Sequence, residues 1–87
     1  MTGRLEYRTV ELANTVELVL VGLLRDYGPA QASLPVEPGE TVLDLIRELG
    51  LNPDLVAIVM VNGRQQFKSH HLQPGDRVKL LPMVGGG

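Results

Sequence analysis

The sequence predicts a single α+β domain of two layers, in which one main helix lies across a mixed sheet of about four to five strands. Segments with the alternating pattern of strands lie on both sides of one helical segment in this 87-residue chain. The clearest helical pattern is Thr41–Gly50. The strands that flank it are separated by about 18 residues, which is long enough for a right-handed crossover. The predicted order is therefore β-β-α-β-β-β.

Two strands are predicted before the helix. Thr15–Val21 has alternating apolar residues on one face, and its other face is also largely apolar. Gln31–Glu37 alternates in the same way, with Pro35 indicating an edge position or a short strand. Leu23–Gly28 has no clear pattern and is expected to form a short turn. These segments predict an antiparallel pair with a long, irregular connection.

The helix is predicted from its caps and from one apolar stripe. Thr41 is a good N-cap, and Asp44 stands where the acid of a capping box would stand. Gly50 is typical of the residue that follows a helix. Apolar residues recur with helical spacing at Val42, Leu45, Ile46 and Leu49. We therefore expect a helix of about ten residues that packs one face on the sheet.

Three strands are predicted after the helix. Leu55–Val61 is apolar throughout, so we expect it to be central or covered on both faces. Asn62-Gly63 predicts a type I′ turn into a short edge strand, Arg64–Lys68. A Pro-Gly turn then leads into the last strand, Arg77–Pro82. The domain therefore spans residues 15–82, preceded by an extension (1–14) that adds a strand or is disordered, and followed by a flexible glycine tail (83–87).

Composition excludes several classes of function. Ten acidic and eight scattered basic residues give a net charge of −2, which argues against a nucleic-acid partner. The chain has no cysteine, so disulfides, thiolate catalysis and zinc–thiolate sites are excluded, and a cytoplasmic location is expected. The apolar stretch Leu18–Leu24 is too short to span a bilayer.

Candidate catalytic and metal-binding residues are few, so we do not expect an enzyme. The Thr41 hydroxyl is expected to cap the helix, and Ser69 and His70, if extended, would point to opposite faces. No nucleophile elbow or phosphate loop is present. His70-His71 is open to a metal or proton-transfer role, but no third ligand clusters with the pair, so two solvated loop histidines are the preferred interpretation.

The glycine tail is the most informative feature. Gly85, Gly86 and Gly87 lack Cβ atoms and can pass through a narrow channel. A terminal carboxylate is ionised near neutrality, because its reference pKa is about 3.3–3.7, and can attack the α-phosphate of ATP. A disordered terminus or an incidental linker is the alternative interpretation.

Four motifs follow one another from Thr41 to the C-terminal end of the sequence. They are the helix Thr41–Gly50, Val61-Asn62-Gly63, Leu72–Val78 with its Pro-Gly-Asp, and Leu81–Gly87. Together they resemble the ubiquitin-like sulfur carriers, which include the small subunit of molybdopterin synthase and the sulfur carrier of thiamine biosynthesis. The resemblance covers about residues 16–87.

This resemblance implies a β-grasp fold and a role as protein cosubstrate. An E1-like enzyme would adenylate Gly87 with Mg-ATP, and sulfur from a persulfide donor would replace the AMP to leave a thiocarboxylate. The tail, recognised at Gly85 and Gly86, would then enter a sulfur-accepting synthase, either the large subunit of molybdopterin synthase or thiazole synthase. The chain itself would bind no cofactor.

The sequence leaves open which biosynthetic pathway receives the sulfur. Leu81-Pro82 and Tyr27-Gly28-Pro29 favour the molybdopterin type, whereas Val84–Gly87 resembles the thiamine carrier as much. We therefore expect molybdopterin biosynthesis, with thiamine thiazole synthesis as the alternative. A non-covalent ubiquitin-like interaction module is also compatible with the sequence, as is conjugation of Gly87 to a lysine.

A partner interface is expected beside the tail. Leu81 lies on the outward face of the last strand, Met83 has the same parity, and Val84 follows. Phe67 is expected on a neighbouring short strand. These side chains would form an apolar docking patch, unless Phe67 belongs to the core with Met83 covering it.

Overall fold

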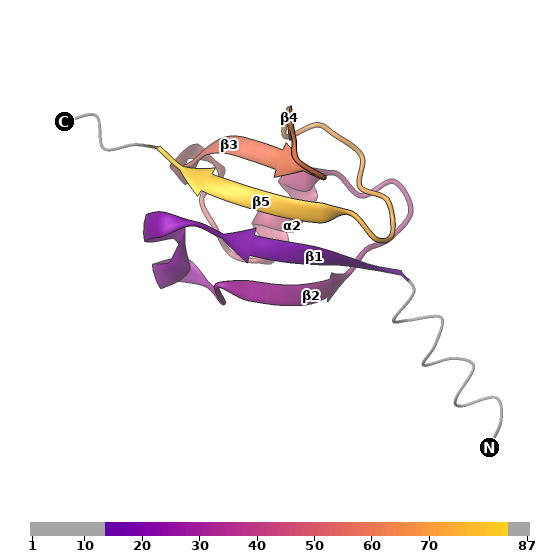
Figure 1. Cartoon of the computed structure of the whole chain (residues 1–87), viewed down its shortest axis with the longest axis horizontal. Helices are drawn as coiled ribbons and strands as arrows, with labels where there is room; N and C mark the ends of the chain where they lie inside the picture. Colours follow the sequence, from indigo (N-terminus) through magenta and orange to yellow (C-terminus); the bar gives the residue numbers. More distant parts are fainter. Residues whose placement is uncertain (1–13, 84–87) are drawn as a thin grey trace, which may run out of the picture.

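A five-stranded mixed sheet with one α-helix on one face makes up residues 14–83, the part of the chain that the computed structural model describes (Figure 1). The strand order is β2-β1-β5-β3-β4. This arrangement confirms the predicted α+β class and its single main helix. The elements are β1 (Thr15–Leu20), η1 (Gly22–Tyr27), β2 (Gln31–Pro35), α2 (Val42–Glu48), η2 (Pro53–Leu55), β3 (Val56–Val61), β4 (Arg64–Gln66) and β5 (Arg77–Pro82), where η denotes a 3-10 helix.

The last strand lies in the middle of the sheet. β5 runs parallel to β1 and antiparallel to β3, and the outer pairs β1–β2 and β3–β4 are antiparallel. Figure 1 shows β5 between these two neighbours, with α2 behind the sheet. The strand that leads into the C-terminal tail is therefore hydrogen-bonded on both sides.

The core lies between α2 and one face of the sheet. The predicted face of β1 is fully buried, as is the helical stripe apart from Leu49, which is half-buried. The largest fully buried side chains are Leu18, Leu20, Leu24, Leu45, Ile46 and Leu80. The core is aliphatic, as the scarcity of aromatic residues requires.

The caps of α2 form as predicted. Thr41 Oγ1 accepts a hydrogen bond from Asp44 N (3.2 Å), and Asp44 Oδ2 accepts one from Thr41 N (3.0 Å). These bonds hold the pKa of Asp44 below its ordinary value. Gly50 follows the C-cap with φ +76°. The helix has seven residues rather than about ten, because the predicted span included the caps Thr41 and Leu49 and the following Gly50.

The two predicted turns after the helix also form. Asn62 and Gly63 have φ of +53° and +82°, the signature of a type I′ turn. Gly75, at the Pro-Gly turn before β5, has φ +90°.

Two predictions were modified by the structure. β3 is an interior strand, in agreement with one of its two predicted placements, but it is covered on one face only, because α2 lies on one side of the sheet. A bulge between Val56 and Ile58 shifts its register, and Ala57 and Ile58 are exposed. Leu23–Gly28 is mostly the 3-10 helix η1 rather than a turn. β5 has the predicted bounds, whereas β1, β2 and β4 end one or two residues earlier than predicted and β3 begins one residue later. The expectations for residues 1–13 and 84–87 lie outside the described residues.

None of the helices within residues 14–83 is long and apolar enough to cross a membrane.

Glu40, just before α2, and Glu48, at the end of α2, form a carboxylate pair that should make the stability of the fold depend on pH. Glu40 is buried, its Oε1 accepts a hydrogen bond from Glu37 N (2.9 Å), and its Oε2 has no partner among the described residues. Desolvation next to its neighbours and the nearby Glu40 charge raise the pKa of the exposed Glu48, which can donate to Glu40 when protonated. Because the folded pKa is raised, this stabilisation is present below the unfolded pKa and is lost as pH rises through the folded pKa.

We therefore expect Glu48→Gln to raise the free energy of unfolding at neutral pH, with a gain that disappears in acid. Urea unfolding between about pH 3 and pH 8 measures this dependence. Asp26→Asn, which removes a charge from an exposed position of η1, is the control. An equal gain at all pH values, or an equal gain from Asp26→Asn, would contradict the pairing with Glu40.

Candidate functional site

The base of the C-terminal tail is fixed by contacts on both sides. Val21 N, just after β1, donates a hydrogen bond to Leu80 O (3.1 Å). Met83 N donates one to Leu55 O at the end of η2 (3.2 Å). Residues 84–87 therefore begin at a position that the sheet and η2 define.

Gly22 permits a close approach at the same place. It has φ +57°, and a Cβ at this position would lie 3.2 Å from Cγ of Pro82, the last residue of β5. Any other residue would combine backbone strain with pressure on Pro82.

This contact predicts that Gly22→Ala changes the position of the tail base. Gly39→Ala is the matched control, because Gly39 has φ +83° but a Cβ added there would meet nothing within 4 Å. We expect both variants to lose about 1 kcal/mol through left-handed strain. Only Gly22→Ala should shift the amide NMR signals of Leu81 and Met83. Equal shifts in the two variants, or none in Gly22→Ala, would contradict a specific contact with Pro82.

Exposed apolar side chains surround the exit of the tail. We call four of them the tail-exit rim: Leu23 (66% exposed), Tyr27 (57%), Leu55 (37%) and Met83 (59%). They line a small cleft together with Leu24 and Pro82. Sequence reasoning missed the members from η1 and η2. The signal that could have found them is the run of apolar residues between Gly22 and Gly28, in which Leu23, Leu24 and Tyr27 have the spacing of one helical face.

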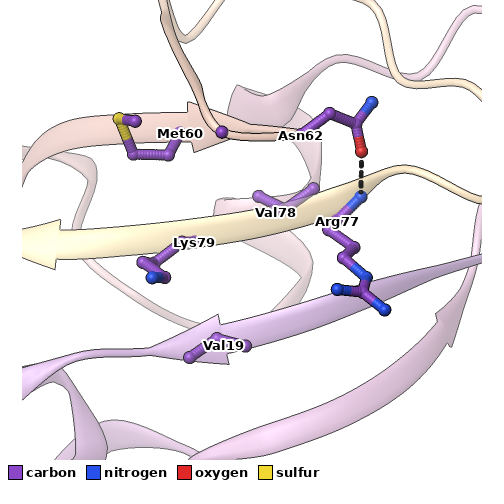
Figure 2. Close-up of a pocket in the computed structure, with 7 residues that line it drawn as sticks. Val19, Met60, Asn62, Arg77, Val78 and Lys79 are labelled. Carbon is purple, nitrogen blue, oxygen red and sulfur yellow. Dashed lines mark hydrogen bonds between the residues drawn. The ribbon is translucent and has the colours of Figure 1, made fainter.

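The face of the sheet opposite α2 carries a shallow hollow of about 570 Å³ (Figure 2). Val19 and Met60 provide apolar surface, and Arg77 and Lys79 provide positive charge. Asn62 Oδ1, at its rim, accepts a hydrogen bond from Arg77 N (2.9 Å). A surface that combines apolar and cationic groups in this way suits contact with another protein.

The predicted interface residues that the structure describes do not all line one surface. Phe67 is 84% exposed, so its alternative placement in the core was wrong, and it follows β4 rather than lying within it. Leu81 is half-buried and pairs with Ile58 of β3. Met83 belongs to the tail-exit cleft, whose lining does not include Phe67. Val84, Gly85, Gly86 and Gly87 lie outside the described residues.

The candidate histidines His70 and His71 contact the backbone near the start of α2. His71 Nδ1 lies 3.2 Å from Gly39 O, and its backbone bridges to Thr41. His70 O accepts a hydrogen bond from Val42 N at the start of α2. Within residues 14–83, no three potential metal-ligating side chains gather in one place. The described part of the chain thus offers surfaces for contact and a fixed tail base.

Comparison with known proteins identifies relatives of the same fold. The model of the ThiS family matches residues 18–87. The solution structure of the Haloferax volcanii HVO 2177 protein is 27% identical, with 84% of this chain and 86% of that chain covered and a TM-score of 0.68. SAMP1 from the same organism is 23% identical (84% and 99% covered, TM-score 0.66). A putative molybdopterin converting factor, subunit 1, from Pyrococcus furiosus is 22% identical (80% and 98% covered, TM-score 0.65). Because the family match spans most of the sequence and the fold agrees, the chain belongs to the ThiS family of ubiquitin-like β-grasp sulfur carriers.

Proposed function

We propose that this protein carries sulfur as a thiocarboxylate on Gly87 for molybdopterin biosynthesis in the cytoplasm. The Gly87 carboxylate oxygen attacks the α-phosphorus of Mg-ATP on an E1-like enzyme, and pyrophosphate leaves. The terminal sulfur of a persulfide donor then attacks the acyl carbon, a C–S bond forms, and AMP leaves. A thiol cleaves the S–S bond of the resulting acyl disulfide, which releases the thiocarboxylate and leaves the donor sulfur in a disulfide with that thiol. In this role the chain is a cosubstrate, and the catalytic groups belong to its partners.

The observation that carries the proposal is the fixed position of the tail base. β5 is hydrogen-bonded on both sides and ends at the Met83–Leu55 hydrogen bond, so only the residues after Met83 need to enter a partner. Gly85 and Gly86 would fit a channel too narrow for other side chains. This arrangement suits delivery of the terminal group into another protein's active site.

The proposed acceptor is the large subunit of molybdopterin synthase. Leu81-Pro82 and Tyr27-Gly28-Pro29 resemble the small subunit of that enzyme. The Pyrococcus furiosus relative described as a putative molybdopterin converting factor subunit agrees with this choice. Phe67, Leu81, Met83 and Val84 are the proposed contacts with the synthase.

The test is mass spectrometry of the chain after incubation with ATP, an E1-like enzyme and a persulfide donor. Conversion to a thiocarboxylate adds about 16 Da, the same nominal mass as oxidation of a methionine. Because Met83 lies in the same C-terminal peptide, fragmentation must place the added mass on Gly87.

Each outcome identifies a different function. Sulfur on Gly87, passed on to a molybdopterin precursor with the synthase large subunit, is the expected result. Transfer only to thiazole synthase would assign the thiamine pathway. Gly87 joined to a lysine would indicate conjugation. An unmodified Gly87, beside a known carrier loaded in the same tube, would indicate a non-covalent module.

A further inference from the structure

We propose that an acidic cleft beside α2 binds a primary ammonium group on an alkyl stem, which is the chemistry of a lysine side chain or of a free aliphatic amine. The cleft lies between the Pro38-Gly39 turn and α2, and we call it the α2 cleft. Three features support this site, and none of them depends on the carrier function. They are a buried carboxylate oxygen without a partner, the charges around it and the place of the cleft in the fold.

The α2 cleft has a volume of about 390 Å³ and is lined mainly by charged side chains. Four carboxylates contribute to its lining, those of Glu37, Glu40, Asp44 and Glu48. Arg47 is the one cation among the lining residues. The carboxylates outnumber the cation, so the potential in the cleft is negative and attracts a positively charged group.

Glu40 supplies a buried acceptor to the α2 cleft. The residue is only 7% exposed. Its Oε1 accepts a hydrogen bond from Glu37 N (2.9 Å), whereas its Oε2 has no hydrogen-bond partner among the residues that the structure describes. Buried polar groups in folded proteins nearly always have a partner, because an unpaired one is costly. Oε2 is therefore the atom that a donor from a ligand would satisfy.

The side chains around Glu40 do not supply this donor. Asp44 is engaged in the capping box, where hydrogen bonds from Thr41 and, to a smaller extent, the charge of Arg47 lower its pKa. At Glu48, desolvation and the charge of Glu40 raise the pKa, so this pair of carboxylates lacks a neighbouring positive charge. A cation placed between Glu40 and Glu48 would relieve their repulsion.

A primary ammonium group matches these acceptors better than a metal ion or a guanidinium group. Divalent cations need several oxygen ligands at once, and within residues 14–83 no three potential ligating side chains are close enough together to hold one. A guanidinium binds a carboxylate best through both oxygens, but Oε1 of Glu40 already has a partner. An ammonium group has three donors that can go to separate oxygens. One donor would reach Glu40 Oε2, and the others would bond to the exposed Glu48 carboxylate and to water.

The lysines of this chain do not supply the ammonium group. Lys68 Nζ donates a hydrogen bond to Pro53 O (2.7 Å), and Lys79 lines the hollow on the sheet face opposite α2. The loop that carries Glu40 lies where β5 begins, because Glu40 O accepts a hydrogen bond from Leu72 N. Figure 1 shows this loop and the end of β5 at opposite ends of the sheet. A ligand can therefore occupy the α2 cleft without approaching the base of the tail.

The test is a titration of the full-length, isotope-labelled protein with N-α-acetyl-lysine methylamide at low ionic strength. The readout is the amide NMR signals of Gly39, Glu40 and Glu48. We expect saturable shifts with a Kd of about 1–10 mM, the strength of one charge-assisted pair at a partly exposed place. Glu40→Gln should raise this Kd about 10-fold or more, because a neutral amide replaces the charged acceptor. Glu17→Gln removes the same charge from an exposed position on the other face of the sheet, so it should bind like the unmodified protein.

Further probes separate the ammonium group from other ligands. The Nε-acetylated form of the probe, which has no charge, and Mg²⁺ should cause no saturable shifts, and the arginine counterpart should bind more weakly. Cadaverine identifies the source of the ligand. A Kd within about threefold of that of the lysine probe assigns the site to a lysine side chain of a partner protein, because a second ammonium group then adds little. Binding about tenfold tighter assigns the site to a free diamine.

Thermal unfolding of each variant checks that the fold is intact. Glu48→Gln, at an exposed position, is a second variant in case Glu40→Gln does not fold, and it should raise the Kd about threefold. Equal Kd values for the unmodified protein and the folded Glu40 or Glu48 variant would overturn the proposed site. So would the absence of saturable shifts with the lysine probe, equal shifts with its acetylated form, or tighter binding of Mg²⁺. Each of these results would leave the carrier function in place.

Discussion

Deletion of Gly87 is expected to abolish thiocarboxylate formation while leaving the domain folded. The shortened chain ends at Gly86, so its carboxylate falls about 3.5 Å short of the position that the activating enzyme requires. Since a misplacement of about 1 Å can cost 100-fold in rate, the loss should exceed that factor. All the described core residues lie before Val84, so the free energy of unfolding should change by less than about 0.5 kcal/mol.

The measurement is the mass of the C-terminal peptide after loading, paired with urea unfolding. Insertion of one glycine after Gly85 is the matched control, because it keeps a terminal glycine but moves it one residue further from Met83. If length matters, deletion and insertion should both slow loading. If the deletion variant is loaded at the rate of the unmodified protein, the carboxylate of residue 87 is not the reactive group.

Local signals predicted most of the elements. The capping box of Thr41 and Asp44 and the turn at Asn62-Gly63 depend on residues close in sequence, so their chemistry can be read directly. The bulge in β3 could not be predicted, because it arises in the pairing of β3 with β5. It moves Val56 to the buried side and reverses the parity that simple alternation assigns to the first residues of that strand.

The tail-exit rim escaped sequence reasoning for a similar reason. Leu23 and Met83 are 60 positions apart, and no local pattern connects them. They meet because β1 and β5 are parallel, which places the residues that follow both strands at the same edge of the sheet. Sequence alternation predicts which face of β5 is outward, and Arg77 and Lys79 are exposed on that face whereas Leu81 is half-buried. It does not reveal which strand lies beside β5.

The position of the tail also depends on the register of β5, and Asp76 holds that register. Its side chain is almost fully buried, and it accepts hydrogen bonds from Asn62 Nδ2 (2.8 Å) and Gln73 N (2.8 Å). Asn62 Oδ1 in turn accepts from Arg77 N, and Asn62 N donates to Arg77 O. The two motifs that resemble the sulfur carriers, at residues 61–63 and 72–78, are thus joined where β5 begins. A slip of one residue would move the tail by about 3.4 Å and exchange the two faces of β5.

Asp76→Ala is therefore expected to lower the free energy of unfolding by about 2–4 kcal/mol, because two donors lose a charged acceptor in a buried place. Asp26→Ala, which removes the same charge from an exposed position of η1, should change it by less than about 0.5 kcal/mol. Asp76→Asn should be intermediate, since its amide can accept from one donor but not from both. Urea unfolding of the three variants measures these differences. If Asp76→Ala unfolds at the same urea concentration as Asp26→Ala, the turn at Asn62-Gly63 and the hydrogen bonds of β5 with its neighbours hold the register without Asp76.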